Sequence, residues 1–101
     1  MEIPMAIGVI FEFPGSASRA KYEQSVKLIL KGRRKRLRDW PVKGVLANIA
    51  GPTPGGWRVV DVWQSQAAFN RFGKKLRPVL KKVGIETVRP KIFPLARFIK
   101  S

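Results

Sequence analysis

Two different hydrophobic periods follow one another in the middle of the chain, and they constrain the fold more than any other feature. Residues 57–63 form a run rich in Val and Trp that predicts a β-strand. Ser65 is expected to be the N-cap of a helix that runs to about Val83 and is closed by Gly84. Its apolar residues recur at helical spacing: Phe69, Phe72, Leu76, Val79, Leu80 and Val83. A strand followed at once by an amphipathic helix indicates a small α+β domain.

Three further strands are expected, at residues 6–13, 42–50 and 91–98. Residues 51–56 are rich in Gly and Pro and are expected to be the loop of a hairpin between the second and third strands. Pro94 pushes the fourth strand towards an edge or a bulge, because proline cannot donate to a central ladder.

One more helix is expected between the first two strands. Ser18 is placed as its N-cap, about Lys31 as its last residue and Gly32 as its stop. Its apolar stripe consists of Tyr22, Val26, Ile29 and Leu30. In the second helix, Pro78 is expected to cause a kink or a division into two pieces. The resulting order, β-α-β-β-α-β, predicts a ferredoxin-like α+β fold over residues 1–101 as one domain.

The composition narrows the chemistry. The 101 residues include 21 Lys and Arg against 6 Asp and Glu, a formal net charge of +15, with no His and no Cys. These counts exclude disulfides, Cys nucleophiles and imidazole bases or ligands, so we expect no metal and no cofactor. No apolar run is long enough to span a bilayer and the N-terminus does not resemble a signal peptide, so a cytoplasmic protein is expected.

The positive charge favours polyanionic partners such as nucleic acid. Cations off the apolar stripes of both helices, together with a basic run after the first helix, form the predicted polyanion-binding surface. Its members are Lys27, Lys31, Arg33, Arg34, Lys35, Arg36, Arg71, Lys74, Lys75, Lys81 and Lys82. A merely solvated, solubilising face is the alternative. Few aromatic residues accompany these cations, so sequence-specific readout is not expected.

A pocket between sheet and helices is the second candidate site. Trp57, Asp61 and Trp63 share strand parity and therefore face one side of the sheet, where Tyr22 and Asn48 are expected to join them. A carboxylate among valines is expected to have a raised pKa and to act as a base, with Asp61, Asn48 and Tyr22 as candidate catalytic residues and the two tryptophans as pocket walls. The alternative is an ordinary structural carboxylate that pairs with a cation such as Arg58 or Arg97, or that accepts backbone hydrogen bonds.

The segment of residues 56–72, with its Gly-Trp-Arg-Val-Val-Asp-Val-Trp start and its Ala-Phe-x-Arg-Phe helix, resembles the dimeric α+β barrel superfamily, which includes antibiotic-biosynthesis-type monooxygenases. The resemblance implies a homodimer in which the sheets of two chains pack together. It also implies a pocket between each sheet and its own helices. A cofactor-independent monooxygenase of this kind binds an electron-rich aromatic, deprotonates it and lets the carbanion react with oxygen.

The chain departs from the pattern of the proteins it resembles. They often carry His where Asn48 stands, and Glu where Gln64 and Gln66 stand. Lys21 occupies a first-turn position where a capping box favours Glu or Gln. Most of these changes replace an acid with a neutral residue or a neutral residue with a cation, which favours an adapted or engineered surface. From sequence alone, the leading hypothesis is therefore a non-enzymatic basic scaffold, for self-assembly into a dimer or a larger particle or for polyanion binding; the alternative is the monooxygenase-like pocket.

Overall fold

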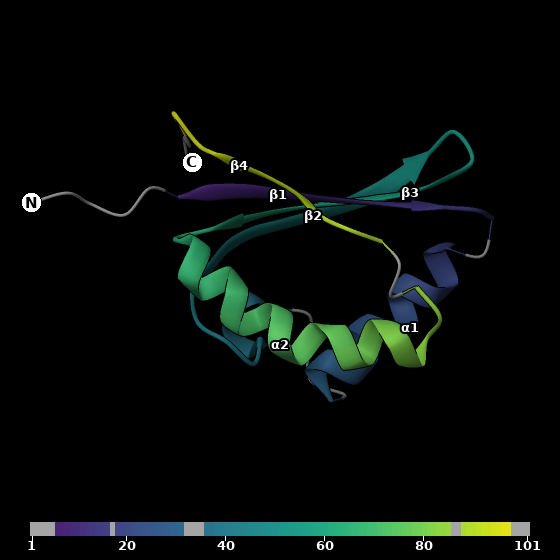
Figure 1. Cartoon of the computed structure of the whole chain (residues 1–101). Coiled ribbons are helices and arrows are strands. Elements are labelled where there is room, and N and C mark those ends of the chain that lie inside the picture. The colour runs from purple at the N-terminus through teal and green to yellow at the C-terminus, as the bar shows by residue number, and fades with distance from the viewer. Residues whose placement is uncertain (1–5, 17, 32–35, 86–87, 98–101) are drawn as a thin grey trace, which may run out of the picture.

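The computed structural model describes residues 6–16, 18–31, 36–85 and 88–97. Its elements are β1 (Ile7–Pro14), α1 (Ser18–Leu30), the short 3₁₀ turn η1 (Leu37–Asp39), β2 (Val45–Thr53), β3 (Gly56–Trp63), α2 (Gln66–Lys82) and β4 (Lys91–Pro94). The strands form one antiparallel sheet in the order β2-β3-β1-β4. Both helices cover the same face of this sheet (Figure 1). The predicted ferredoxin-like arrangement is confirmed.

The two central strands, β1 and β3, provide the floor of the core. Phe11 pairs with Val59 and Phe13 with Trp57 in the antiparallel register, and all four side chains are buried under the helices. Because side chains alternate along a strand, the next residues point to the opposite face. This parity confirms that Trp57, Asp61 and Trp63 lie on one side of the sheet, the side that the helices cover.

Helix α2 follows the prediction closely. The Ser65 hydroxyl accepts a hydrogen bond from the Ala68 amide at 3.1 Å, and Gly84 after the helix has a φ of 83°. Its apolar stripe packs into the core. Pro78 does not divide the helix, so that part of the prediction is wrong. Pro78 is exposed, and water can hydrate the carbonyl that its missing N–H leaves without a helical partner.

Helix α1 differs from the prediction at both ends. Ser18 is the first helical residue rather than the cap, and its hydroxyl donates to the Gly15 carbonyl at 2.7 Å. The helix ends at Leu30, and Lys31 takes the left-handed conformation with a φ of 51°. Gly32, the predicted stop, lies outside the described residues.

Strand β2 begins three residues later than predicted and runs to Thr53. The expected loop therefore shrinks to a tight turn at Pro54 and Gly55, where Gly55 has a φ of 75°. Pro52 is tolerated inside the strand because β2 is an edge strand. Strand β4 is also an edge strand, as Pro94 predicted, but it ends at that proline.

Candidate active site

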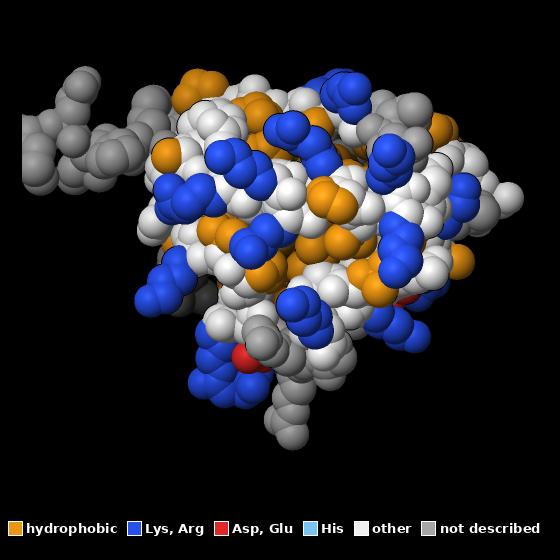
Figure 2. Space-filling view, turned by 60° about the horizontal axis from the view of Figure 1, so that its bottom comes forward, with side chains coloured by type: hydrophobic (Ala, Val, Ile, Leu, Met, Phe, Trp, Pro, Cys, Tyr) orange, Lys and Arg blue, Asp and Glu red, His pale blue; other side chains and the backbone are white. Residues whose placement is uncertain are grey.

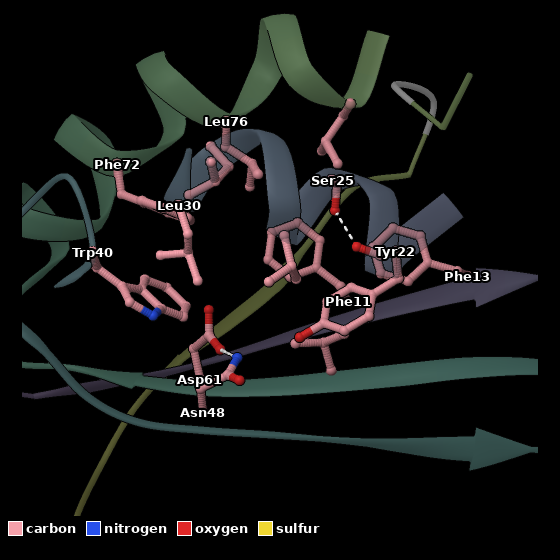
Figure 3. A pocket seen from close by; sticks show the side chains of 14 residues that line it. Phe11, Phe13, Tyr22, Ser25, Leu30, Trp40, Asn48, Asp61, Phe72 and Leu76 are labelled. Atoms are coloured by element: carbon pink, nitrogen blue, oxygen red, sulfur yellow. Dashed lines mark hydrogen bonds between the residues drawn. The ribbon is translucent and has the colours of Figure 1, made fainter. Parts of the chain in front are cut away.

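A small cavity lies between the sheet and the two helices. Its volume is about 60 Å³, and its walls are almost entirely apolar and aromatic. Phe11, Phe13 and Val59 form the floor on the sheet, and side chains of α1 and α2 form the roof (Figure 3). Three polar side chains that the sequence singled out, Tyr22, Asn48 and Asp61, line this cavity. The fold thus brings together residues that are up to 39 positions apart in the chain, from Tyr22 to Asp61.

Asp61 is the centre of the polar group. Its side chain comes from the central strand β3 and only 2% of its surface is exposed. Asn48 Nδ2 donates to its Oδ1 at 2.6 Å, and Trp63 Nε1 makes a longer bond of 3.4 Å to its Oδ2. Burial raises the pKa of Asp61 from 3.8 to about 6, and the bonds from Asn48 and Trp63 partly oppose that rise.

No cation neutralises this carboxylate among the described residues. Arg58, one of the two partners considered from the sequence, faces the other side of the sheet and pairs with Glu12 at 3.1 Å. Arg97, the other, is exposed beyond the end of β4. The alternative of an ordinary structural ion pair therefore does not describe Asp61. Its charged form is supported by two neutral N–H donors alone.

Asn48 owes its position to strand register. It lies on the edge strand β2 directly opposite Asp61, so its amide reaches the carboxylate across the ladder. Tyr22 approaches from α1, where the Ser25 hydroxyl donates to the Tyr22 carbonyl one turn away at 2.7 Å (Figure 3). Burial raises the pKa of the Tyr22 phenol; hydrogen bonding to Asn48 acts in the opposite direction, and the charge of Asp61 adds to the rise. Tyr22 is therefore a neutral hydroxyl near pH 7.

The two predicted wall residues lie behind the cavity rather than in its lining. Trp63 is fully buried and packs against Phe69 and Phe72 while its indole N–H holds Asp61. Trp57 packs against the ring of Tyr22, with the centroids 5.9 Å apart. Its Nε1 is buried and has no hydrogen-bond partner among the described parts of the chain. Both tryptophans thus position the residues that face the cavity.

Trp40 is a wall residue of the cavity that was not predicted from the sequence. In the sequence it stands beside the basic run, where the cations are the more prominent feature. In the structure its ring packs on that of Phe72, with the centroids 5.1 Å apart, and lines the cavity. The Trp-Pro pair after η1 was the available signal, since a large aromatic beside a turn is commonly an anchor. A groove of about 110 Å³ adjoins the cavity here and shares five lining residues with it: Tyr22, Val26, Leu30, Trp40 and Asn48. Leu37 and Glu23 line only the groove, and Leu37 is exposed.

The predicted basic residues do not approach this site as a group. Those on α1 and α2 are exposed on the outer side of the helices, Arg36 pairs with Asp39 at 2.8 Å, and residues 33–35 lie outside the described part of the chain. Within the described ranges, no three Asp, Glu, His or Cys side chains come close enough to hold a metal ion. Nor does any described helix have the length and apolar character needed to cross a membrane.

The chemistry open to this arrangement is proton transfer in an apolar enclosure. A carboxylate with a pKa of about 6 is mostly ionised at pH 7, yet it is a much stronger base than an exposed aspartate. The neighbouring Asn48 amide and Tyr22 hydroxyl can orient a bound oxygen or hydroxyl group. The aromatic floor suits a planar, apolar molecule.

No protein-family model and no curated protein sequence matches the chain. Solved structures do match it in fold. SnoaB from Streptomyces nogalater, a cofactor-independent oxygenase, superposes with a TM-score of 0.63 at 10% identity, over 96% of this chain and 99% of that one. A putative monooxygenase from Shewanella loihica superposes with a TM-score of 0.59 at 17% identity, over 99% of this chain and 100% of that one. A putative antibiotic biosynthesis monooxygenase from Deinococcus radiodurans superposes with a TM-score of 0.58 at 15% identity, over 96% of this chain and 98% of that one. The chain therefore has the fold of the antibiotic-biosynthesis-monooxygenase-like proteins, as its resemblance implied.

Proposed function

We propose that the protein is a cofactor-independent monooxygenase-like enzyme that acts on a small, electron-rich aromatic molecule with Asp61 as its general base. The observation that carries the proposal is the state of Asp61: a buried carboxylate without a cationic partner among the described residues, held by Asn48 and Trp63 at the wall of an apolar cavity. Folding gains little from such a group, because burying a charge costs free energy unless it is paired. Titratable groups in this situation are concentrated at functional sites.

Two independent lines support this choice over the non-enzymatic scaffold favoured from the charge. The structural neighbours include SnoaB, described as a cofactor-independent oxygenase, and two proteins described as putative monooxygenases. A scaffold, in addition, has no use for an unpaired carboxylate inside its core. The engineered or adapted origin of the positive surface stays a prediction.

The proposed reaction oxidises an activated methylene group to a carbonyl group with dioxygen. Asp61 removes a proton from the carbon, and the electron pair left on that carbon reduces O₂ in one-electron steps and forms a C–O bond. Protonation gives a hydroperoxide; loss of the second C–H proton with cleavage of the O–O bond yields the ketone and water. The balance is R₂CH₂ + O₂ → R₂C=O + H₂O. The substrate supplies all four electrons, so no added reductant is needed.

The size of the cavity restricts how such a substrate binds. About 60 Å³ is less than half of the roughly 150 Å³ apolar cavity that holds benzene in an engineered protein core. The adjoining groove adds about 110 Å³ on the same wall of Tyr22 and Asn48. We therefore place the reacting carbon at Asp61 and the rest of the molecule in the groove towards Leu37, with some outward movement of Trp40 or Leu30 on binding.

Oxygen uptake tests the proposal. The purified protein, with no cofactor added, is expected to consume one O₂ for each molecule of an anthrone-type substrate that it oxidises to the quinone, and to release the second oxygen atom as water. Asp61→Asn keeps the size of the side chain and removes the base, so we expect turnover to fall by a factor of about 10²–10⁴. Glu12→Gln is the matched control, because it removes a carboxylate from the same sheet on the face away from the cavity; its native mass is measured as well, since that face is the one proposed below for the dimer. Equal turnover in Asp61→Asn and wild type would refute the assignment of the base.

The opposite face of the sheet supports the predicted homodimer. This face carries Ile10, Val60, Val62 and Phe93, and Ile49 beside them is 66% exposed. The ion pair between Arg58 and Glu12 cancels two charges on this face, whereas acidic partners are scarce over the rest of the surface. We propose that a second copy covers this face, sheet against sheet.

The native mass tests this arrangement. Wild-type protein is expected to sediment as a dimer in about 0.5 M salt, where the repulsion between two copies of charge +15 is screened. Ile49→Lys is expected to shift it towards monomer, whereas Gln66→Lys, on the helical side, adds the same charge and leaves the dimer intact. A monomeric wild type at high protein concentration would refute this part of the proposal.

A further inference from the structure

The solvent face of α2 has a one-sided charge distribution. The helix spans Gln66–Lys82 and contains no Asp or Glu, but six cations: Arg71, Lys74, Lys75, Arg77, Lys81 and Lys82. All six are exposed. Helix α1 beside it adds exposed Arg19 and Lys27, and exposed Lys31 follows directly after the helix. Figure 2 shows these helices from outside, with Lys and Arg side chains spread across the whole face and very little acidic surface between them.

These cations repel one another. None of the six on α2 makes a hydrogen bond or an ion pair with another described residue. Arg71 and Lys75, like Arg77 and Lys81, are four residues apart and so lie side by side on the helix surface, where a like-charge pair costs about 0.2–0.5 kcal/mol. A face selected for stability alone would include acidic residues at this spacing. The arrangement lowers the stability of the free protein and is compensated only when an anionic partner binds.

We propose that this helical face, defined by the exposed cations of α2 and α1, binds the phosphate backbone of double-stranded nucleic acid without reading its sequence. Duplex phosphates form a regular array of negative charge at about the scale of the face, and binding releases condensed counterions. The proposal does not depend on the activity assigned to the cavity, which lies on the inner side of the same helices.

The exposed groups on this face favour nucleic acid over a membrane. An interfacial helix inserts its apolar side into lipid, but Phe69, Phe72 and Leu80 of α2 are buried against the sheet and are not free to insert. The same burial limits base recognition. Trp40, the aromatic residue nearest the basic run, is partly buried and packs on Phe72 and Trp63, so its ring is not free to stack on bases.

The length of α2 sets the expected strength of the salt effect. Seventeen residues at about 1.5 Å each extend about 25 Å, which matches about seven base pairs of duplex. Contact with about five phosphates gives a slope of about −4.5 for log K against log salt concentration. The affinity is then expected to fall about 500-fold between 50 and 200 mM salt.

Fluorescence anisotropy with labelled duplexes of about 20 base pairs and two unrelated sequences tests the proposal. The protein is first treated with nuclease and stripped of bound nucleic acid in high salt. The test variant is Lys74→Glu with Lys81→Glu. The matched control is Lys91→Glu with Arg97→Glu, which changes the net charge equally on β4 and just after it. Lys91 pairs with Ile10 and so lies on the sheet face opposite the helices, the face proposed for the dimer. Native mass is recorded for all three proteins, so that each affinity is compared at the same oligomeric state.

We expect equal affinity for both duplexes. The α2 variant is expected to bind at least about 30-fold more weakly than wild type at about 100 mM salt, because it loses two phosphate contacts. For the same reason its slope of log K against log salt concentration is expected to be near about −2.7, whereas the control keeps a slope near about −4.5. Equal weakening by the two variants would show that overall charge rather than this face attracts the duplex, and would overturn the proposal. So would the absence of binding at about 50 mM salt, or binding to vesicles that contain phosphatidylserine in place of binding to the duplex.

Discussion

Asp61→Asn is expected to change how the stability of the folded protein depends on pH. Burial raises the pKa of Asp61 from 3.8 to about 6, so the folded state holds this proton more tightly than the unfolded chain does. The stability that Asp61 contributes as a neutral acid is fully present below pH 3.8 and is lost as the pH rises through about 6. A difference of about two pKa units corresponds to about 3 kcal/mol in all, of which about 2 kcal/mol is lost between about pH 4.5 and 8.

Urea unfolding of wild type and Asp61→Asn across that pH range measures this effect. Asparagine cannot ionise, so the variant is expected to gain about 2 kcal/mol relative to wild type between about pH 4.5 and 8. The substitution also changes the free energy of unfolding by an amount that does not depend on pH, because the amide keeps an acceptor for Asn48 and loses only the long bond from Trp63. Both proteins are compared at one concentration, since dimerisation makes stability concentration-dependent. A difference that does not vary with pH, or that varies in the opposite direction, would refute the assignment of a raised pKa.

Four further substitutions test the local structure around the site. Ser65→Ala removes the hydroxyl that caps α2 and is expected to cost about 1 kcal/mol in the free energy of unfolding, measured with urea; no loss would mean that the cap is not formed. Trp57→Phe removes a buried N–H that has no partner among the described residues, whereas Trp63→Phe removes a donor to Asp61. Trp57→Phe is therefore expected to destabilise the protein less than Trp63→Phe. The two melting temperatures rank the variants, and the reverse order would contradict these contacts. Asn48→Ala removes the shortest hydrogen bond to the carboxylate and is expected to raise the pKa of Asp61 above about 6. NMR titration of the side-chain carboxyl carbon of Asp61 measures this pKa. An unchanged value would show that the bond is not formed in solution.

The parts of the fold that the sequence predicted well are those with strong local signals. The helix after Ser65 combines a cap, an apolar stripe and a terminal glycine, and the structure reproduces each of them. Strand parity likewise placed Asp61 on the covered face. Strand β2 was placed less well, because Pro52 reads as a turn residue unless the strand is known to lie at the edge of the sheet. Edge position is a property of the whole sheet and is not encoded locally.

The candidate site was predictable as a set of residues but not as an arrangement. The contact between Asn48 and Asp61 depends on the β2–β3 register, which a bulge between Val45 and Ala47 shifts. Trp40 lies in the wall only because the segment that includes η1 folds back under the sheet. Long-range packing of this kind has no signature in periodicity or spacing. That no described cation lies beside Asp61, the observation on which the proposed base rests, also became visible only in three dimensions.

The pH dependence of kcat/KM for oxidation of an anthrone-type substrate, without added cofactor, shows whether Asp61 is the base. Because this ratio reports ionisations of the free enzyme, we expect it to rise with pH through a midpoint near about 6 in wild type and in Glu12→Gln. The rise is expected to be missing from the residual activity of Asp61→Asn. A midpoint at the same pH that persists in Asp61→Asn would contradict the claim that Asp61 is the base.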